Sequence, residues 1–100
     1  MEDQKANMVI TAVVNKANIS ELPSYLEQIQ PIFAKNGAKS VGRYKTVQNL
    51  GGSDSPEIIS ILEFDNAETI ISMVQSEEFT RLAELRGRVF DKLNLMICGS

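Results

Sequence analysis

The stretch that decides the fold is EIISILEFDNAETIISMV, which covers residues 57–74. Its first eight residues are rich in β-branched and aromatic side chains, which predicts a buried strand over 57–64. Asp65 or Asn66 then stands where a capping residue would start a short helix. Glu63 is unexpected in this strand, because it places a carboxylate near the end of a run that is otherwise almost all apolar.

The segments on either side complete the order of elements. Short β-branched runs predict three further strands, and amphipathic segments predict helices. The first helix should start at a capping box made by Asn18 and Glu21, or at Ser20, and Pro31 should kink or divide it. A glycine-rich loop over 48–56 predicts a long hairpin. The expected elements are strands over 8–15, 38–47, 57–64 and 93–98, and helices over about 18–35, 66–75 and 76–90.

This βαββαβ order is the ferredoxin-like pattern, an α+β fold with a four-stranded antiparallel sheet. Right-handed crossovers place the first and third strands in the centre and both helical segments on one face, with Ile59 and Ile61 expected to face the helices. The first strand is apolar at both parities, since Met8 and Ile10 alternate with Val9, whereas a sheet with one wet face alternates apolar and polar residues. A second copy of the chain is the simplest cover, so the sequence predicts a homodimer. A smaller bare patch with scattered apolar residues is the alternative.

The bulk composition bounds the class of protein. One hundred residues, 43% apolar and 23% charged, fit one globular domain over 1–100, with 1–7 expected to be a flexible N-terminus. The net charge of −3 disfavours nucleic acid as a partner, and no apolar run reaches the roughly 20 residues of a membrane span. The single cysteine, Cys98, and the absence of histidine indicate neither a metal site nor a cofactor, and they fit a cytoplasmic protein.

A buried charge is the most specific expectation about a side chain. At about 100° per residue, Arg86 falls inside the apolar stripe formed by Phe79, Leu82 and Val89. A guanidinium stays charged, and burying it without an anion is costly. Glu63 is therefore predicted to pair with Arg86 inside the core. The alternative is that the pair, or its arginine, faces a ligand acid.

Arg43 raises a related question in the second strand. It shares its side of the strand with Lys39 and Lys45, so a solvated basic edge is one interpretation and an anion site is the other. Tyr44 lies on the opposite side, where it either packs or lines a cavity with its hydroxyl as a polar handle.

The chain resembles the DUF1330 family of the dimeric α/β-barrel superfamily over about residues 8–99. The resemblance rests on Tyr25 with PIFAKNG (31–37), Arg43, EFDNAE (63–68) and SEEFTRLAELR (76–86), taken in that order. It implies two ferredoxin-like units whose sheets face each other around a central cavity, with no established common chemistry. The chain departs from the family where Gly37 is followed by Ala38, and where Gly51-Gly52 lacks an acidic neighbour. A reaction that needed this acid would be in doubt here.

Two functions follow from these observations. The first is a homodimer that binds a small organic molecule, expected to be anionic, between its sheet and its partner, with or without cofactor-independent catalysis. Glu63 is then the candidate general base. The second is a non-catalytic scaffold or interaction module with a filled barrel. The candidate ligand-binding residues are Thr11, Arg43, Tyr44, Ser60, Phe64 and Arg86, with Val13, Leu62 and Met96 as further lining.

Overall fold

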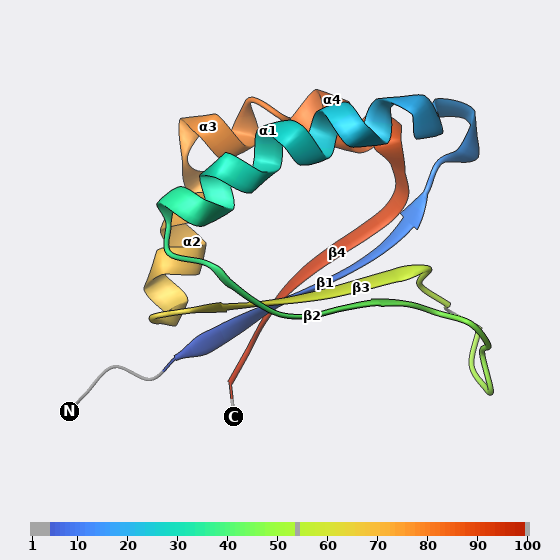
Figure 1. Cartoon of the computed structure of the whole chain (residues 1–100), viewed down its shortest axis with the longest axis horizontal. Coiled ribbons are helices and arrows are strands. Elements are labelled where there is room, and N and C mark those ends of the chain that lie inside the picture. The colour runs from blue at the N-terminus through green and yellow to red at the C-terminus, as the bar shows by residue number, and fades with distance from the viewer. Residues whose placement is uncertain (1–4, 54, 100) are drawn as a thin grey trace.

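The computed structural model describes residues 5–53 and 55–99. Within them the chain forms one sheet with helices on one side of it, as Figure 1 shows. The elements are β1 (Ala6–Val14), a 3-10 helix η1 (Lys16–Glu21), α1 (Leu22–Lys35), β2 (Lys39–Lys45), β3 (Ile58–Phe64), α2 (Ala67–Gln75), α3 (Glu77–Thr80), α4 (Ala83–Val89) and β4 (Phe90–Cys98).

The described strands form a four-stranded antiparallel sheet in the order β2-β3-β1-β4. β1 and β3 are therefore central, and the predicted ferredoxin-like α+β fold is confirmed. β1 begins at Ala6, so the expectation of a flexible segment over 1–7 is wrong for its last two residues. Ala6 pairs with β3, and Asn7 pairs with both β3 and β4. The part of that expectation that falls on residues 1–4 lies outside the described residues.

The connection between β2 and β3 is the predicted long hairpin. Its ends are joined by a hydrogen bond from the Thr46 N–H to the Glu57 carbonyl at 3.0 Å. Figure 1 shows it extending past the end of the sheet that is far from the N and C termini. Val47 and Leu50 are 98% and 90% exposed there, so the hairpin packs little of its own apolar surface within one chain.

Capping residues set the starts of two helices as predicted. Asn66 caps α2 by accepting the N–H three residues later at 2.9 Å, and Ser76 caps α3 by accepting the Phe79 N–H at 3.2 Å. The expected single helix over 76–90 is wrong, because the backbone leaves the helical conformation near Leu82 and divides it into α3 and α4.

The start of the first helical region also differs from the prediction. Asn15, rather than Asn18 or Ser20, caps η1, since its Oδ1 accepts the Ala17 N–H at 2.9 Å. Asn18 instead donates through Nδ2 to the Arg88 carbonyl at 3.0 Å. The predicted capping box is thus replaced by a tertiary contact.

Pro31 does not divide α1, which continues through it. The helix ends where the sequence predicts, at Asn36-Gly37, and Gly37 takes a left-handed φ of 80°.

The strand register defines two faces of the sheet. Met8 lies opposite Leu62, and Val9 lies opposite Ile61. Met8 is 1% exposed, so its side is the one that the helices cover, and we name it the helix-covered face. The expectation that Ile59 and Ile61 face the helices is wrong. Ile61 pairs with Val9, whose side chain points away from that of its neighbour Met8, and Ile59 lies on the same side of the strand as Ile61. The other side, named the open face, carries Asn7, Val9, Thr11, Val13, Tyr44, Ile59, Ile61, Glu63, Asn94, Met96 and Cys98.

The hydrophobic core lies between the helix-covered face and the helices. Apolar burial in this layer is the main stabilising contribution to a domain of this size. Its buried members are Ala6, Met8, Tyr25, Ile29, Ile32, Phe64, Ile70, Met73, Phe79, Leu82 and Val89.

Candidate functional site

A cavity of about 380 Å³ lies between α1 and the helix-covered face. Its walls are mainly aliphatic and aromatic. Apolar walls with a few polar groups are typical of sites for small molecules. The polar side chains that line it are Tyr25, Gln30, Ser40, Arg43 and Ser60.

α1 supplies one wall because its apolar residues recur at helical spacing. Leu22, Leu26, Ile29 and Phe33 form the stripe that the sequence predicts, and all four line the cavity. The opposite wall is the sheet, with Ile10, Ile58, Ser60, Leu62, Leu93 and Leu95. All the residues that line this cavity belong to one chain, whereas the sequence predicts a cavity between the sheet and a partner.

Arg43 is the one charged residue among those that line the cavity. A register shift between Ser40 and Gly42 precedes it, and its Cα partner is Ser60, on the helix-covered face. A Cβ on the neighbouring Gly42 would come within 2.6 Å of the Tyr44 ring, so a larger residue there would require the exposed Tyr44 side chain to move. Within the described residues Arg43 has no hydrogen-bond or ion-pair partner, so its guanidinium is available to a ligand.

Arg86 lies beside this cavity, and its partners are not those predicted. Its Nε donates to the Tyr25 hydroxyl at 3.1 Å, and its Nη2 donates to the Phe79 carbonyl at 2.8 Å. The guanidinium carbon lies 4.0 Å from the Phe79 ring centroid and 5.8 Å from the Tyr25 ring centroid. The predicted ion pair with Glu63 is wrong, because a carbonyl, a hydroxyl and two aromatic faces take the place of the carboxylate.

Tyr25 is missing from the predicted site residues. It is 7% exposed, lines the cavity, and packs edge-to-face on Phe90 with ring centroids 5.5 Å apart. Its spacing of four residues before Ile29 puts it on the buried side of α1, and this signal could have identified it.

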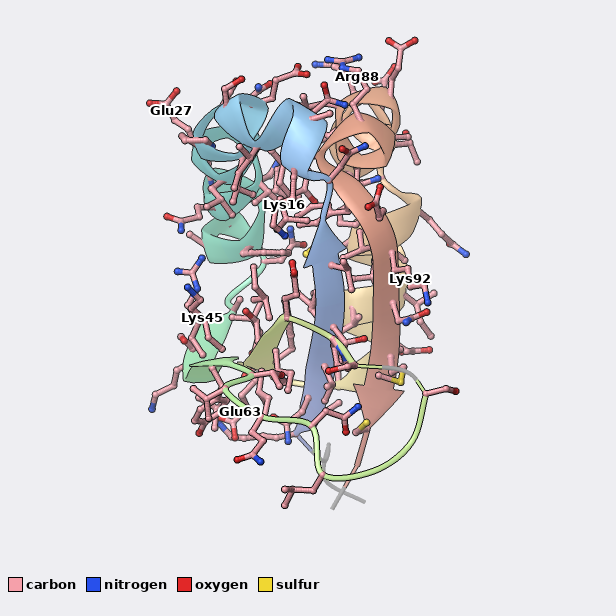
Figure 2. The ribbon with its side chains drawn as sticks, turned by 90° about the vertical axis from the view of Figure 1, so that its right-hand side faces the viewer. Lys16, Glu27, Lys45, Glu63, Arg88 and Lys92 are labelled. Carbon is pink, nitrogen blue, oxygen red and sulfur yellow. The ribbon has the colours of Figure 1, made fainter. Side chains whose placement is uncertain are left out.

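Glu63 lies on the open face and forms an ion pair with Lys5, with Nζ and Oε1 3.6 Å apart. Figure 2 places Glu63 near the lower end of the sheet and Arg88 at the top, in the helix that also carries Arg86. Glu63 does not line the cavity, and no carboxylate of the described residues does.

The structure separates the remaining candidates. Ser60 lines the cavity, and Phe64 is buried in the core at 1% exposure. Tyr44 is on the open face, where it is 56% exposed. Thr11 is also on the open face, where Asn94 Nδ2 lies 3.4 Å from its Oγ1. Thr11 lines an open depression of about 450 Å³ together with Val13, Ser55, Pro56, Lys92 and Asn94, and Tyr44 does not line it.

The open face has no cover within the described chain. Met96 is 43% exposed there, in a row of apolar residues in which Val9 lies opposite Met96 on one side and opposite Ile61 on the other. The Asn7 Oδ1 atom is buried and has no hydrogen-bond partner among the described residues. A buried polar atom without a hydrogen-bond partner is unfavourable.

Two charged groups have shifted pKa values, and both lie away from the cavity. Lys16 and then the Val14 N–H donate to Glu57 and hold the pKa of that carboxyl below its ordinary value. The carboxylate of Glu21 accepts from Arg88 at 3.0 Å and raises the pKa of that guanidinium. These pairs tie the ends of the elements together and contribute no chemistry to the cavity.

Residues 5–53 and 55–99 contain no cluster of three or more acidic or cysteine side chains able to hold a metal ion. In the same residues no helix is long and apolar enough to cross a membrane.

The sheet order, the helices on one face and the cavity under α1 define the chain as a ferredoxin-like α+β protein. A family model described as a domain of unknown function, DUF1330, matches residues 6–99. The chain belongs to the DUF1330 family, as its sequence predicts. The comparison with curated proteins gave no match.

Solved structures with low sequence identity share the fold. The RPA0582 protein of unknown function from Rhodopseudomonas palustris is 14% identical with a TM-score of 0.81, over 99% of this chain and 84% of that one. A dimeric protein of unknown function with a ferredoxin-like fold from Bacteroides fragilis is 11% identical with a TM-score of 0.66, over 100% of both chains. A dabb family protein with a ferredoxin-like fold from Mesorhizobium loti is 8% identical with a TM-score of 0.70, over 96% of both chains.

Proposed function

We propose that the protein binds a small, mostly apolar organic anion in the cavity between α1 and the sheet. The observation that carries this proposal is the single charged lining residue, Arg43, which stands in a mainly apolar wall without a partner among the described residues. A carboxylate is the natural group for it, because a guanidinium can hold both oxygens at once. The apolar body of the ligand would then lie against Leu26, Ile29 and Phe33 of α1.

The assembly that we propose is a homodimer in which two open faces pack together. Two observations support a second copy as the cover: the apolar residues of the open face, and the dimeric protein of like fold from Bacteroides fragilis. A two-fold interface presents the same patch on both partners, and a sheet face suits that arrangement. Each protomer would keep its own cavity.

The same arrangement limits what Glu63 can do. Its proposed role as a general base applies only to chemistry on the open face or at the interface, because the cavity has no carboxylate among its described lining residues. Binding in the cavity therefore stands as a proposal independent of catalysis.

Ligand binding is tested by thermal shift and calorimetry with a panel of aliphatic and aromatic carboxylates. A ligand at one hundred times its dissociation constant should stabilise the protein by about 2.7 kcal/mol. Arg43→Gln should weaken binding roughly tenfold or more, because it removes a charged hydrogen-bonding partner. Lys45→Gln is the matched control. It removes the same charge from the same strand, but Lys45 does not line the cavity.

Two results would count against the proposal. If Arg43→Gln and Lys45→Gln weaken binding equally, the effect is the overall charge and not the cavity. If no carboxylate binds, the alternative of a non-catalytic scaffold takes its place.

A further inference from the structure

The hydrogen bond between Arg86 and Tyr25 has a direction. Arg86 Nε can only donate, so at 3.1 Å the Tyr25 oxygen is the acceptor. The phenolic proton is not used in this bond. Within residues 5–53 and 55–99 the hydroxyl has no acceptor of its own, although the side chain is 7% exposed. Buried tyrosine hydroxyls usually find a partner for this proton.

The surroundings of Tyr25 fix its position. Arg86 is itself held by the Phe79 carbonyl at 2.8 Å and by stacking on the Phe79 ring at 4.0 Å. The Tyr25 ring packs edge-to-face on Phe90 at 5.5 Å. The hydroxyl is thus anchored from α4 and its ring from β4, on a residue of α1 that lines the cavity.

Given the binding function proposed above, we propose that Tyr25 donates a hydrogen bond to the ligand and that Arg86 positions it. The ligand then carries two polar groups: an anionic group for Arg43 on β2, and a neutral acceptor such as a ketone oxygen for Tyr25 where α1 meets α4. Tyr25, Phe79 and Phe90 line the cavity near this second group, so we expect the apolar part of the ligand to be an aromatic ring that packs against them. The class that fits is an aryl keto acid.

A purely structural role for the Tyr25 hydroxyl predicts something different. It would only join α1 to α4, and its loss would lower stability without changing which ligand is preferred. The test therefore measures a ratio of two affinities, which a general loss of stability leaves unchanged. Phenylbutanoate and benzoylpropanoate are suitable probes, because they share a skeleton and differ by a ketone oxygen beside the ring.

The experiment is isothermal calorimetry of both probes with the wild type, Tyr25→Phe and Tyr44→Phe. The wild type should bind benzoylpropanoate roughly three- to tenfold more tightly than phenylbutanoate, the range of one net hydrogen bond. Tyr25→Phe keeps the ring and should bring the ratio to about one, since it removes only the donor. Tyr44→Phe is the matched control, because Tyr44 lies on the open face, and it should keep the wild-type ratio.

The outcomes separate the two proposals. If both probes bind but the ketone gives no advantage, or the advantage survives in Tyr25→Phe, the role of Tyr25 is overturned while the binding cavity stands. If neither probe binds the wild type, both proposals fail for this ligand class. Should Tyr25→Phe not fold, Arg86→Lys replaces it: it keeps the charge but loses the Nε donor, and an unchanged ratio in that variant overturns the positioning role.

Discussion

Both faces of the sheet carry apolar side chains, but the two faces differ in environment. On the central strands the helix-covered face buries Met8, Ala12 and Phe64, at 1%, 3% and 1% exposure, whereas no described residue of the open face is buried. On the edge strand β4 both faces are exposed, with Ile97 of the helix-covered face and Met96 of the open face each at 43%. Both crossover connections put their helices on the same side, so only one apolar face gains a cover within the chain. The apolar character of a strand therefore shows that a face needs burial, but the connections decide what buries it.

The two sides of the sheet also differ in the partners that surround a charged side chain. On the covered side, Arg86 is held by the Tyr25 hydroxyl, the Phe79 carbonyl and the Phe79 ring. On the open side, Glu63 has a lysine, Lys5, whose side chain is 66% exposed. An exposed pair of this kind contributes little to stability because water screens it. The covered charge is therefore the one that constrains the fold.

The comparison is tested most strongly by removing one large side chain from each face. Phe64→Ala on the covered face should lower the free energy of unfolding by roughly 3–5 kcal/mol, because it opens a cavity in the core. Ile61→Ala on the open face should cost less, and its cost should depend on protein concentration if the face is a dimer interface. Denaturant unfolding at several concentrations measures both. Equal, concentration-independent losses would mean that the two faces are equally buried within one chain.

A charge on the open face sharpens the comparison further. Ile61→Glu would place a carboxylate from each protomer in the proposed interface, where burial is unfavourable. Association should weaken on the order of a hundredfold, about 2.7 kcal/mol, as measured by sedimentation equilibrium. Ser72→Glu, on the exposed side of α2, adds the same charge away from the sheet and should leave the association unchanged. A wild type that is monomeric at micromolar concentration contradicts the proposed dimer.

A smaller effect is expected from removing the covered charge. Arg86→Met should lower the free energy of unfolding by about 1–2 kcal/mol, the sum expected for a cation–π contact and a hydrogen bond. Arg81→Met should change the free energy of unfolding by less than about 0.5 kcal/mol, because Arg81 is exposed and forms only a weak ion pair with Glu77, at 3.8 Å, one helical turn away. Thermal and denaturant unfolding of the two variants measure the difference. A larger loss for Arg81→Met would show that Arg86 is not held as described.

The smallest effect concerns Glu57, which joins the hairpin to the end of β1. Its pKa is lowered by Lys16 and by the Val14 N–H, so its contribution to stability is present above the unfolded-state pKa. That contribution is lost as the pH falls through the lower folded-state pKa. The stability difference between the wild type and Glu57→Gln should therefore be largest near neutral pH and shrink below about pH 4. A difference that grows on acidification would contradict this assignment.

The sequence by itself determined the features that depend on neighbours along the chain. The order βαββαβ, the central positions of the first and third strands, and the caps at Asn66 and Ser76 all follow from local periodicity and turn chemistry. The stripe of Leu22, Leu26, Ile29 and Phe33 follows from the repeat of the α-helix. These features require no knowledge of what lies across the core.

Only the tertiary structure decided the features that depend on distant contacts. A strand that is apolar at both parities leaves its facing undetermined, so Ile59, Ile61 and Glu63 were assigned to the wrong side. A guanidinium can donate to several kinds of oxygen and can stack on aromatic faces. Arg86 binds Tyr25, 61 residues away, and the Phe79 ring instead of a carboxylate. The position of the cavity inside one protomer depends in turn on how closely α1 approaches the sheet, and no sequence pattern fixes that approach, because it depends on the packing of all the side chains between them.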